Sequence, residues 1–417
     1  MANNNRLQKH LERACLQHLC RNQVPDYSSL AVNQSVIKTL EIFWQFFLLG
    51  WTSFGGPAAH IGYFRHAFVE RLQWLSDEQY SQLVALSQFL PGPGSSQVGF
   101  AIGYRRAGLL GGCAAFVGFT LPSFVILLAV AMSSHAFFDA SWYQWVIEGL
   151  KLLAVVVVAD AIIQMYRSFC QRSLTVALCV FSAAILLIVP GVQAQMAVLV
   201  LAAGIGWRWL PASTDQRENY RIKVWPLVLF GGLLLLLPLV AGQRPLLTLF
   251  SDFYQAGSMV FGGGHVVLPL LQNTTKDLIN TDTFLTGYAA AQAIPGPMFT
   301  LSAYLGYFAS DAIPVLGAVI ATIAIFLPGF LLVIGMLHAW QAVAGRARVA
   351  GAISGINASV VGLLVAAMYS PVFVTAVHTS LEFALALVGF YLLRVRRWPV
   401  YWLVGLAIVL GALVLKA

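Results

Sequence analysis

Charged residues are scarce in this chain. Only 10% of its 417 residues are Asp, Glu, Lys or Arg, whereas a soluble domain carries about 25%. Hydrophobic residues make up 59% of the chain, and apolar stretches long enough to cross a bilayer recur along it. This composition excludes a soluble globular protein and predicts an all-α polytopic membrane protein.

The chain also lacks the residue patterns that most cofactor sites need. Its five cysteines form no CxxC pair and have no histidine at ligand spacing, so we expect neither a metal site nor a disulfide framework. It contains no flavin or nucleotide fingerprint and no haem pair, so we expect no cofactor and no enzymatic activity. Residues 1–36 contain no apolar signal segment or small-residue cleavage site, and we interpret them as a cytoplasmic tail.

The basic residues indicate membrane topology rather than a nucleic-acid partner. The net charge is +8, but Lys and Arg lie in the gaps between apolar stretches instead of forming one patch. The stretches predict thirteen spans, near residues 37–53, 80–103, 108–132, 144–166, 173–190, 193–209, 224–241, 247–269, 284–307, 312–337, 350–370, 380–393 and 399–415.

The distribution of these charges predicts an orientation in the bilayer. With a cytoplasmic N-terminus, 19 of the 24 basic residues fall on the cytoplasmic side. Arg65, Arg71, Arg244 and Lys416 fall outside, and Lys151 lies within a span. We therefore expect a multi-pass protein of a bacterial inner membrane, surrounded by lipid, with a periplasmic C-terminus.

Three motifs occur twice, about 205 residues apart. SFGGPAAH at 53–60 corresponds to VFGGGHVV at 260–267, LPGP at 90–93 to IPGP at 294–297, and LPSF at 121–124 to LPGF at 327–330. This order predicts two six-span repeats, at 37–210 and 246–417, joined by a linker at 211–245 that holds one extra span. A single extra span inverts the second repeat in the membrane, and inverted repeats with interrupted helices are typical of secondary transporters.

Both Pro-Gly-Pro motifs lie inside apolar stretches, where they are expected to break a helix. Broken backbone at membrane depth persists only if it lines a polar cavity or is buried in protein. The residues after each break begin a new half-helix, whose free N–H groups and positive dipole end favour an anion. Side-chain donors follow both breaks: Ser95, Ser96 and Gln97 after the first, Thr300 and Ser302 after the second. A structural kink is the alternative, but two related copies beside two FGG turns favour a binding site.

Together these motifs resemble the chromate ion transporters, in the long form with two homologous halves. The resemblance covers essentially all of the chain after the tail. In the first half it rests on FGGPAAH, Arg65, WLS before an acidic residue at 74–78, LPGPGSSQ, Gly103 with Tyr104, and LPSF. In the second half it rests on FGGGHVVLP, Gln292 before the second Pro-Gly-Pro, and FLPGF at 326–330.

This resemblance implies an antiporter that exports chromate and confers chromate resistance. Chromate is a tetrahedral dianion close in size to sulfate, and export would use the proton-motive force with protons as the coupling ion. An importer of sulfate or another small anion, coupled to a cation, is the alternative, since it would share every motif. The oligomeric state is left open, with a homodimer as one alternative.

The predicted anion site combines the two FGG turns with the two breaks. Its candidate residues are Phe54, Gly55, Gly56, Pro57, His60, Arg65, Pro91, Gly92, Pro93, Ser95, Ser96, Gln97, Phe261, Gly262, Gly263, Gly264, His265, Gln292, Pro295, Gly296, Pro297, Thr300 and Ser302. Arg65 is included because an arginine fork suits an oxyanion and because the resemblance favours this role over an interfacial one. For His60 and His265, a titrating role in proton coupling is the alternative to a hydrogen-bonded polar role.

Three charged residues within one predicted span are candidates for coupling or for intramembrane charge. Glu148 and Lys151 are three residues apart on a helix and can pair. Asp160 lies deeper, where an unpaired carboxylate is costly and indicates function. A hydrogen-bonded packing role is the alternative for Asp160.

Overall fold

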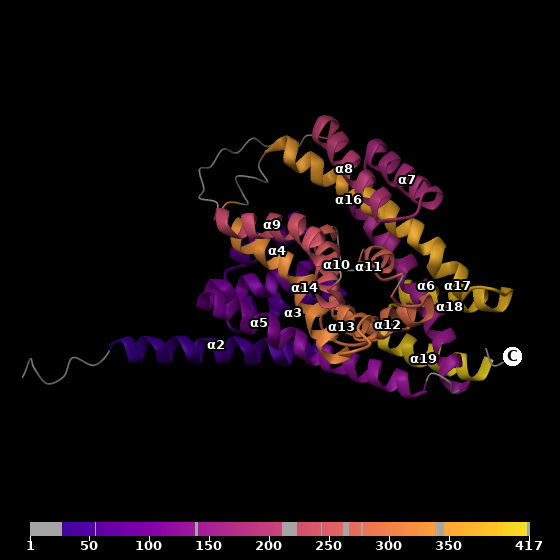
Figure 1. The fold of residues 1–417 in the computed structure, drawn as a ribbon, viewed down its shortest axis with the longest axis horizontal. Coiled ribbons are helices and arrows are strands. Elements are labelled where there is room, and N and C mark those ends of the chain that lie inside the picture. The colour runs from indigo at the N-terminus through magenta and orange to yellow at the C-terminus, as the bar shows by residue number, and fades with distance from the viewer. Residues whose placement is uncertain are drawn as a thin grey trace, which may run out of the picture.

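The computed structural model describes residues 27–54, 56–137, 141–210, 223–242, 244–261, 267–276, 278–337, 339 and 346–414. Within these ranges every regular element is a helix (Figure 1). The elements before the first long connection are α2 (Tyr27–Thr52), α3 (Gly56–Arg65), the π-helical turn η1 (His66–Arg71), α4 (Asp77–Phe89), α5 (Gly94–Phe137), α6 (Ser141–Phe169), α7 (Ser173–Ile188) and α8 (Val192–Trp209). After α9 (Val224–Ala241) follow α10 (Pro245–Met259), α11 (Val267–Thr275), α12 (Thr281–Ala293), the short turn η3 (Met298–Thr300), α13 (Leu301–Phe308), α14 (Pro314–Met336), α16 (Ala347–Ala367), η4 (Met368–Phe373), α17 (Val374–Ala376), α18 (Ser380–Arg394) and α19 (Val400–Val414).

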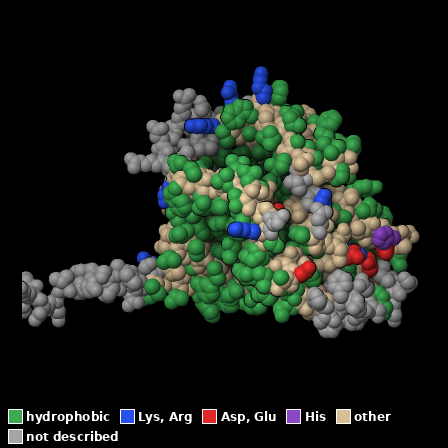
Figure 2. All heavy atoms as spheres, viewed as in Figure 1, with side chains coloured by type: hydrophobic (Ala, Val, Ile, Leu, Met, Phe, Trp, Pro, Cys, Tyr) green, Lys and Arg blue, Asp and Glu red, His purple; other side chains and the backbone are tan. Residues whose placement is uncertain are grey.

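Several of these helices have the length and composition of membrane spans. Among the described residues, Gly94–Ser134, Val224–Ala241, Pro314–Met336 and Ala347–Ala376 are long and apolar enough to cross a bilayer. Large hydrophobic side chains are exposed along the outside, and they cover most of the face seen in Figure 2. Extensive apolar surface of this kind is typical of contact with lipid, so the structure agrees with the predicted all-helical polytopic membrane protein.

The order of helices before α9 recurs after it. The repeated motifs align α2, α3 and α4 with α10, α11 and α12, residues 94–106 of α5 with α13, and residues 109–137 of α5 with α14. Chain order then matches α6, α7 and α8 with α16, α18 and α19. Packing between the two sets is reciprocal, because α16 contacts α7 and α8 while α6 contacts α18 and α19. Each half therefore completes its helix bundle with a long helix of the other half.

The first hairpin is formed by α2, α3 and η1, which turn at the FGG motif. The rings of Phe46 on α2 and Phe64 on α3 lie 5.4 Å apart, and Phe68 on η1 stacks 4.7 Å from Phe46. Arg71, at the end of η1, donates to Gln45 of α2 at 2.7 Å. The chain therefore runs back along α2 after the turn. In Figure 1, the N-terminal part of α2 extends beyond the body of the molecule, because this helix begins ten residues before the predicted span.

The second hairpin is formed by α4 and residues 94–106 of α5, which turn at the first Pro-Gly-Pro motif. A capping box at Ser76 begins α4, since Ser76 Oγ accepts from Gln79 N and Gln79 Oε1 accepts from Ser76 N. The guanidinium of Arg106 lies 4.0 Å from the ring centroid of Trp74, just before α4, and Arg106 also pairs with Glu41 of α2 at 3.0 Å. The chain thus returns to the end of the molecule from which α4 started, which we call the Arg106 end.

A break at Ala107 and Gly108 then turns the chain into the rest of α5. Gly108 has φ +62°, and a side chain on Gly103 would run into the carbonyl of Gly111 across this turn. Residues 109–137 form a single helix that is roughly 40 Å long, at 1.5 Å per residue. This is enough to cross a bilayer, and it carries the chain to the opposite side, next to the start of α6.

The second half forms the same hairpins from that opposite side. Asn280 caps α12 by accepting from Thr283 N at 2.7 Å, and Asp282 in its first turn pairs at 2.8 Å with Lys151 in the N-terminal half of α6. We call this side the Lys151 end. Helix α13 folds back along α12, because Gly287 lies directly against the ring of Tyr304. Helix α14 then leads to the Arg106 end, where Gly335 O accepts from Lys223 N at 3.3 Å.

In the structure the stretches at 37–53, 80–103, 247–269 and 284–307 belong to hairpins that turn back. The sequence predicts instead that each of them crosses the membrane. A span prediction counts apolar residues and does not register that the chain turns back halfway. Two short apolar helices joined by a turn therefore have the same hydropathy as one crossing helix. Consequently Arg65 and Arg71 lie towards the Arg106 end, and Lys276, which precedes α12, lies towards the Lys151 end.

We expect cysteine labelling to distinguish the hairpins from crossing spans. In a cysteine-free variant in inverted and right-side-out vesicles, Glu78→Cys should be labelled from the cytoplasmic side and Leu278→Cys from the periplasmic side. Thirteen crossing spans predict the reverse for both positions. Lys223→Cys and Arg244→Cys are matched controls, because both topologies place them in the cytoplasm and periplasm respectively.

Candidate functional site

The tips of the hairpins from the two halves meet through a reciprocal pair of backbone hydrogen bonds. Gly92 N, in the first Pro-Gly-Pro motif, donates at 2.7 Å to the carbonyl of Val260, which precedes the second FGG motif. Gly296 N, in the second Pro-Gly-Pro motif, donates at 2.9 Å to the carbonyl of Ser53, which precedes the first FGG motif. Each break therefore satisfies its backbone in the opposite half.

The central glycine of each Pro-Gly-Pro motif has a conformation and surroundings that leave no room for a side chain. Gly92 has φ +122° and Gly296 has φ +102°, a backbone region that L side chains rarely adopt. A Cβ on Gly92 would lie 3.1 Å from the Cα of Gly329, and a Cβ on Gly296 would lie 2.8 Å from Oγ of Ser123. Gly329 and Ser123 are equivalent residues of the LPGF and LPSF motifs, so all three pairs of motifs converge on one centre.

This centre lies halfway along the long helices. Ser123 is the midpoint of residues 109–137 in α5, and Pro328 and Gly329 lie just past the middle of α14. If these helices cross a bilayer, the broken backbone lies near its midplane, which is where secondary transporters of this plan bind their substrates.

The N-terminus of α5 supplies polar groups to this centre. Ser95, Ser96 and Gln97 are all buried. Ser95 Oγ lies 3.2 Å from Nδ1 of His60, and Gln97 Nε2 donates to Pro91 O at 2.8 Å. The N–H groups of the first helical turn have no acceptor within the helix, so they are available to an anion.

Several buried polar atoms near the meeting tips lack a hydrogen-bond partner among the described residues. They include Oγ of Ser53, Nε2 of His60, Oγ of Ser96, Oε1 of Gln97 and Oγ1 of Thr120. An unsatisfied buried polar group costs about 1–3 kcal/mol. All five belong to the first half of the chain, and their concentration there fits a site completed by a polar ligand or by water.

The second break is less polar. The hydroxyl of Thr300 donates to Pro297 O at 2.6 Å and that of Ser302 to Phe299 O at 2.8 Å. Gln292 Nε2 donates to the sulfur of Met298 at 2.8 Å. The predicted donors Thr300 and Ser302 are therefore occupied by the backbone, and the site is asymmetric although the fold is repeated.

A cavity of about 580 Å³ opens beside the first break. Six of the residues predicted from sequence line it: Gly56, Pro57, Gly92, Ser95, Gln292 and Asp160. Its wall also contains polar residues that the sequence did not single out, namely Ser87, Gln88, Gln164 and Ser168, and the indole of Trp398. The cavity therefore combines both halves and joins the anion-favouring N-terminus of α5 to a charged group on α6.

Arg65 lies on the surface, away from this cavity. Its side chain is 47% exposed, and it pairs with Asp77 at 2.9 Å and with Glu70 at 2.5 Å. The hydrogen bond that Arg65 donates to Asp77, together with the charge of that carboxylate, raises the pKa of Arg65 above its usual value. The guanidinium fork is thus engaged with carboxylates, and the site defined by the cavity does not include it.

The predicted pair of Glu148 and Lys151 is present, at 2.8 Å. Asp282 of the other half is a second partner of Lys151, which is only 6% exposed. Asp160 is also paired, since Arg394 of α18 contacts it at 3.0 Å. Sequence spacing could indicate only the first of these pairs, because the other partners lie more than 130 residues away in the chain.

The remaining candidates are placed as follows. Phe54 packs its ring 5.5 Å from that of Tyr401, and Pro91, Pro93, Phe261, Pro295 and Pro297 lie in the tips themselves. Gly55, Gly262, Gly263, Gly264 and His265 lie outside the described residues.

Two helical halves that meet at broken membrane helices define a membrane transporter rather than an enzyme. A comparison with protein families matches residues 40–207 and 247–412 to the chromate transporter family, and the chain belongs to that family. The resemblance inferred from the motifs is thereby confirmed.

Individual relatives cover most of this chain. It is 27% identical to an uncharacterized transporter of Methanocaldococcus jannaschii over 91% of this chain and 95% of the relative. It is 28% identical to a chromate transport protein of Cupriavidus metallidurans, covering 83% of this chain and 86% of the relative. A chromate transport protein of Pseudomonas aeruginosa is 26% identical, with 78% and 79% covered. No solved structure matches the chain.

We expect Gly92→Ala and Gly296→Ala to abolish transport, because each new Cβ forces a strained backbone that costs about 1–3 kcal/mol and separates the two halves. Transport and thermal unfolding of the purified variants measure the effect. Gly231→Ala is the matched control, since nothing lies within 4 Å of a Cβ there. Gly111 is unsuitable as a control, because its Cβ would meet the Gly103 carbonyl. Normal transport by both tip variants would contradict a site at the breaks.

Proposed function

We propose that the protein is a secondary active transporter that exports chromate across the bacterial inner membrane and thereby confers chromate resistance. The observation that carries this proposal is the reciprocal pair of hydrogen bonds from Gly92 to Val260 and from Gly296 to Ser53, with a polar cavity beside them. Two relatives that cover most of their own length are named chromate transport proteins, which supports this cargo.

The chemistry at the first break suits a fully deprotonated tetrahedral dianion. The first-turn N–H groups of α5 and the hydroxyls of Ser95 and Ser96 can donate to oxyanion oxygens. The amide NH2 of Gln97 is already engaged by the carbonyls of Pro91 and Gly329. The one carboxylate in the cavity wall, Asp160, already accepts hydrogen bonds from Arg394 and Gln164. Phosphate near neutral pH still carries a proton donor that needs an acceptor, so we expect sulfate to compete with chromate and phosphate to compete poorly.

The hairpins suggest how the two halves lie in the membrane. We place the Arg106 end in the cytoplasm and the Lys151 end in the periplasm, so that the halves insert their tips from opposite sides as an inverted repeat. Of the 24 basic residues, only Arg244, Lys276 and Lys416 then lie outside and Lys151 within the bilayer. The positive-inside rule favours this orientation, with a cytoplasmic N-terminus and a periplasmic C-terminus.

Electrostatics favour export as the direction. Moving one charge across 100 mV involves about 2.3 kcal/mol, so a dianion leaving a cell with a negative interior gains about 4.6 kcal/mol at that potential. The electrical part of the proton-motive force therefore drives export even before a proton is exchanged. We propose that protons are the coupling ion.

An importer of sulfate coupled to a cation is the second candidate. It would need carboxylates that are free to bind the cation, yet Asp160, Glu148 and Asp282 are all ion-paired. Asp252 on α10 is half-buried and has no ion-pair partner among the described residues. An importer could use the Asp252 carboxylate to bind its cation. No sequence motif marks this residue.

We expect expression of the protein to lower cellular chromate and raise tolerance to it. In liposomes with the purified protein, an imposed potential should drive chromate towards the positive side, and external sulfate should slow this transport more than phosphate does. Asp252→Asn should leave this transport unchanged. Cells that accumulate more chromate and become more sensitive would instead support the importer.

A further inference from the structure

The cavity presents an electrostatic problem for an anion site. Asp160 contributes a carboxylate to the wall that also holds Gly92 and Ser95. Its side chain is only 14% exposed, so solvent screens it weakly and it would repel a dianion in the same cavity. A dianion can therefore bind here only if it takes over the cation that pairs with this carboxylate, which then keeps the hydrogen bond from Gln164.

Arg394 provides the compensating positive charge in the empty protein. Its Nη1 contacts Oδ1 of Asp160 at 3.0 Å, while Gln164 Nε2 donates to the other oxygen, Oδ2, at 2.5 Å. Asp160 lies on α6 of the first half and Arg394 at the end of α18 of the second. The pair leaves this part of the wall close to neutral.

Arg394 lies directly behind the cavity wall, next to residues that line it. Its neighbour Leu393 lines the cavity, as do Trp398, Pro399 and Val400 in the segment that follows. The Arg394 side chain is 27% exposed. Apart from the contact with Asp160, no hydrogen bond or ion pair of Arg394 is present among the described residues. The rest of its donor fork is therefore available for an oxyanion.

The other groups around Asp160 offer no competing charge. From α12 the cavity wall receives the amide of Gln292, from α4 that of Gln88, and from α5 the hydroxyl of Ser95. Lys151, the basic residue nearer the start of α6, is held by Glu148 and Asp282. Arg394 is thus the basic residue that contacts the carboxylate of the cavity wall, whereas Arg167, between the lining residues Gln164 and Ser168, is exposed and has no ion pair among the described residues.

The geometry points to an exchange in which a tetrahedral oxyanion displaces the carboxylate of Asp160 from Arg394. Asp160 occupies the arginine fork in the empty protein, and the oxyanion occupies it when bound. This inference rests on the proposed anion site and assigns its cationic ligand. Carboxylates and oxyanions of this charge compete for the same arginine fork, because both offer paired oxygens to its parallel N–H donors.

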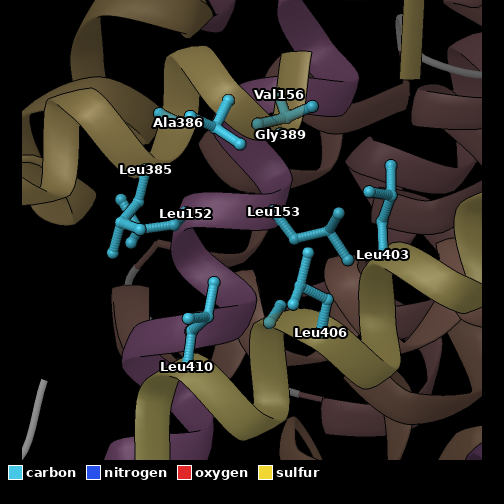
Figure 3. Close-up of a pocket in the computed structure, with 12 residues that line it drawn as sticks. Leu152, Leu153, Val156, Leu385, Ala386, Gly389, Leu403, Leu406 and Leu410 are labelled. Atoms are coloured by element: carbon cyan, nitrogen blue, oxygen red, sulfur yellow. The ribbon is translucent and has the colours of Figure 1, made fainter. Parts of the chain in front are cut away.

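The exchange would also couple binding to movement of the helices. The Asp160–Arg394 pair joins α6 to α18, and an apolar pocket of about 50 Å³ lies where these helices meet α19 (Figure 3). Leu152 and Val156 of α6 face Leu385 and Gly389 of α18 there, and only apolar side chains line the gap. No polar contact across the pocket resists a shift of α18 once Arg394 leaves Asp160.

Binding of sulfate and of chromate to the purified full-length protein, measured by titration calorimetry, tests this exchange. We expect Arg394→Gln to weaken both by about tenfold or more, as for loss of a hydrogen-bonded charge. Arg394→Lys should weaken them less. Asp160→Asn should tighten both by about tenfold, because it removes the internal competitor. Arg396→Gln, two residues further on and exposed, should bind like the unaltered protein.

The double variant Asp160→Asn, Arg394→Gln controls for folding, because it replaces the ion pair with two neutral amides. It should fold and still bind weakly. If Arg394→Gln binds as well as Arg396→Gln, or if Asp160→Asn binds no more tightly than the unaltered protein, the exchange is overturned and the pair is structural. If the unaltered protein binds neither anion, the proposed anion site itself fails.

Discussion

The structure depends on the need to satisfy backbone N–H and C=O groups where helices are broken inside a membrane. Lipid offers these groups no hydrogen-bond partner, so each one that stays unsatisfied costs several kcal/mol. Here each Pro-Gly-Pro tip donates from its glycine to the carbonyl before the FGG motif of the opposite half, Gly92 to Val260 and Gly296 to Ser53. Neither half can satisfy its own break, and this shared requirement fixes all the hairpin tips at one centre.

A repeated fold does not require a repeated site. The two breaks share their backbone geometry, but Ser95, Ser96 and Gln97 follow the first, whereas Met298, Phe299 and Thr300 follow the second. The hydroxyls after the second break donate to nearby carbonyls, while Ser96 and Gln97 after the first have polar atoms without a partner among the described residues. The first half therefore supplies most of the polar chemistry, and the second half contributes backbone support, Gln292 and Arg394.

Buried charged side chains are also satisfied by partners from the opposite half. A buried ion without a partner is strongly destabilising, and α6 carries two buried charges that each find a partner in the other half, Lys151 with Asp282 and Asp160 with Arg394. Both ion pairs hold α6 against the second half, one towards the Lys151 end and one at the cavity. Arg65 is the exposed counterpart, since its network with Glu70 and Asp77 stays within the first half.

The sequence by itself determined the membrane class, the two related halves, the broken helices and six residues of the cavity wall, because these follow from composition and from the local chemistry of proline and glycine. It also predicted the pair of Glu148 and Lys151, which are one helical turn apart. Tertiary structure decided which apolar stretches turn back: α4 and residues 94–106 of α5 are each about 20 Å long, and together they equal one span in hydropathy. It also decided that Arg394, rather than Arg65, pairs with a residue of the cavity wall, because a charge more than 200 residues from its partner leaves no local sequence pattern.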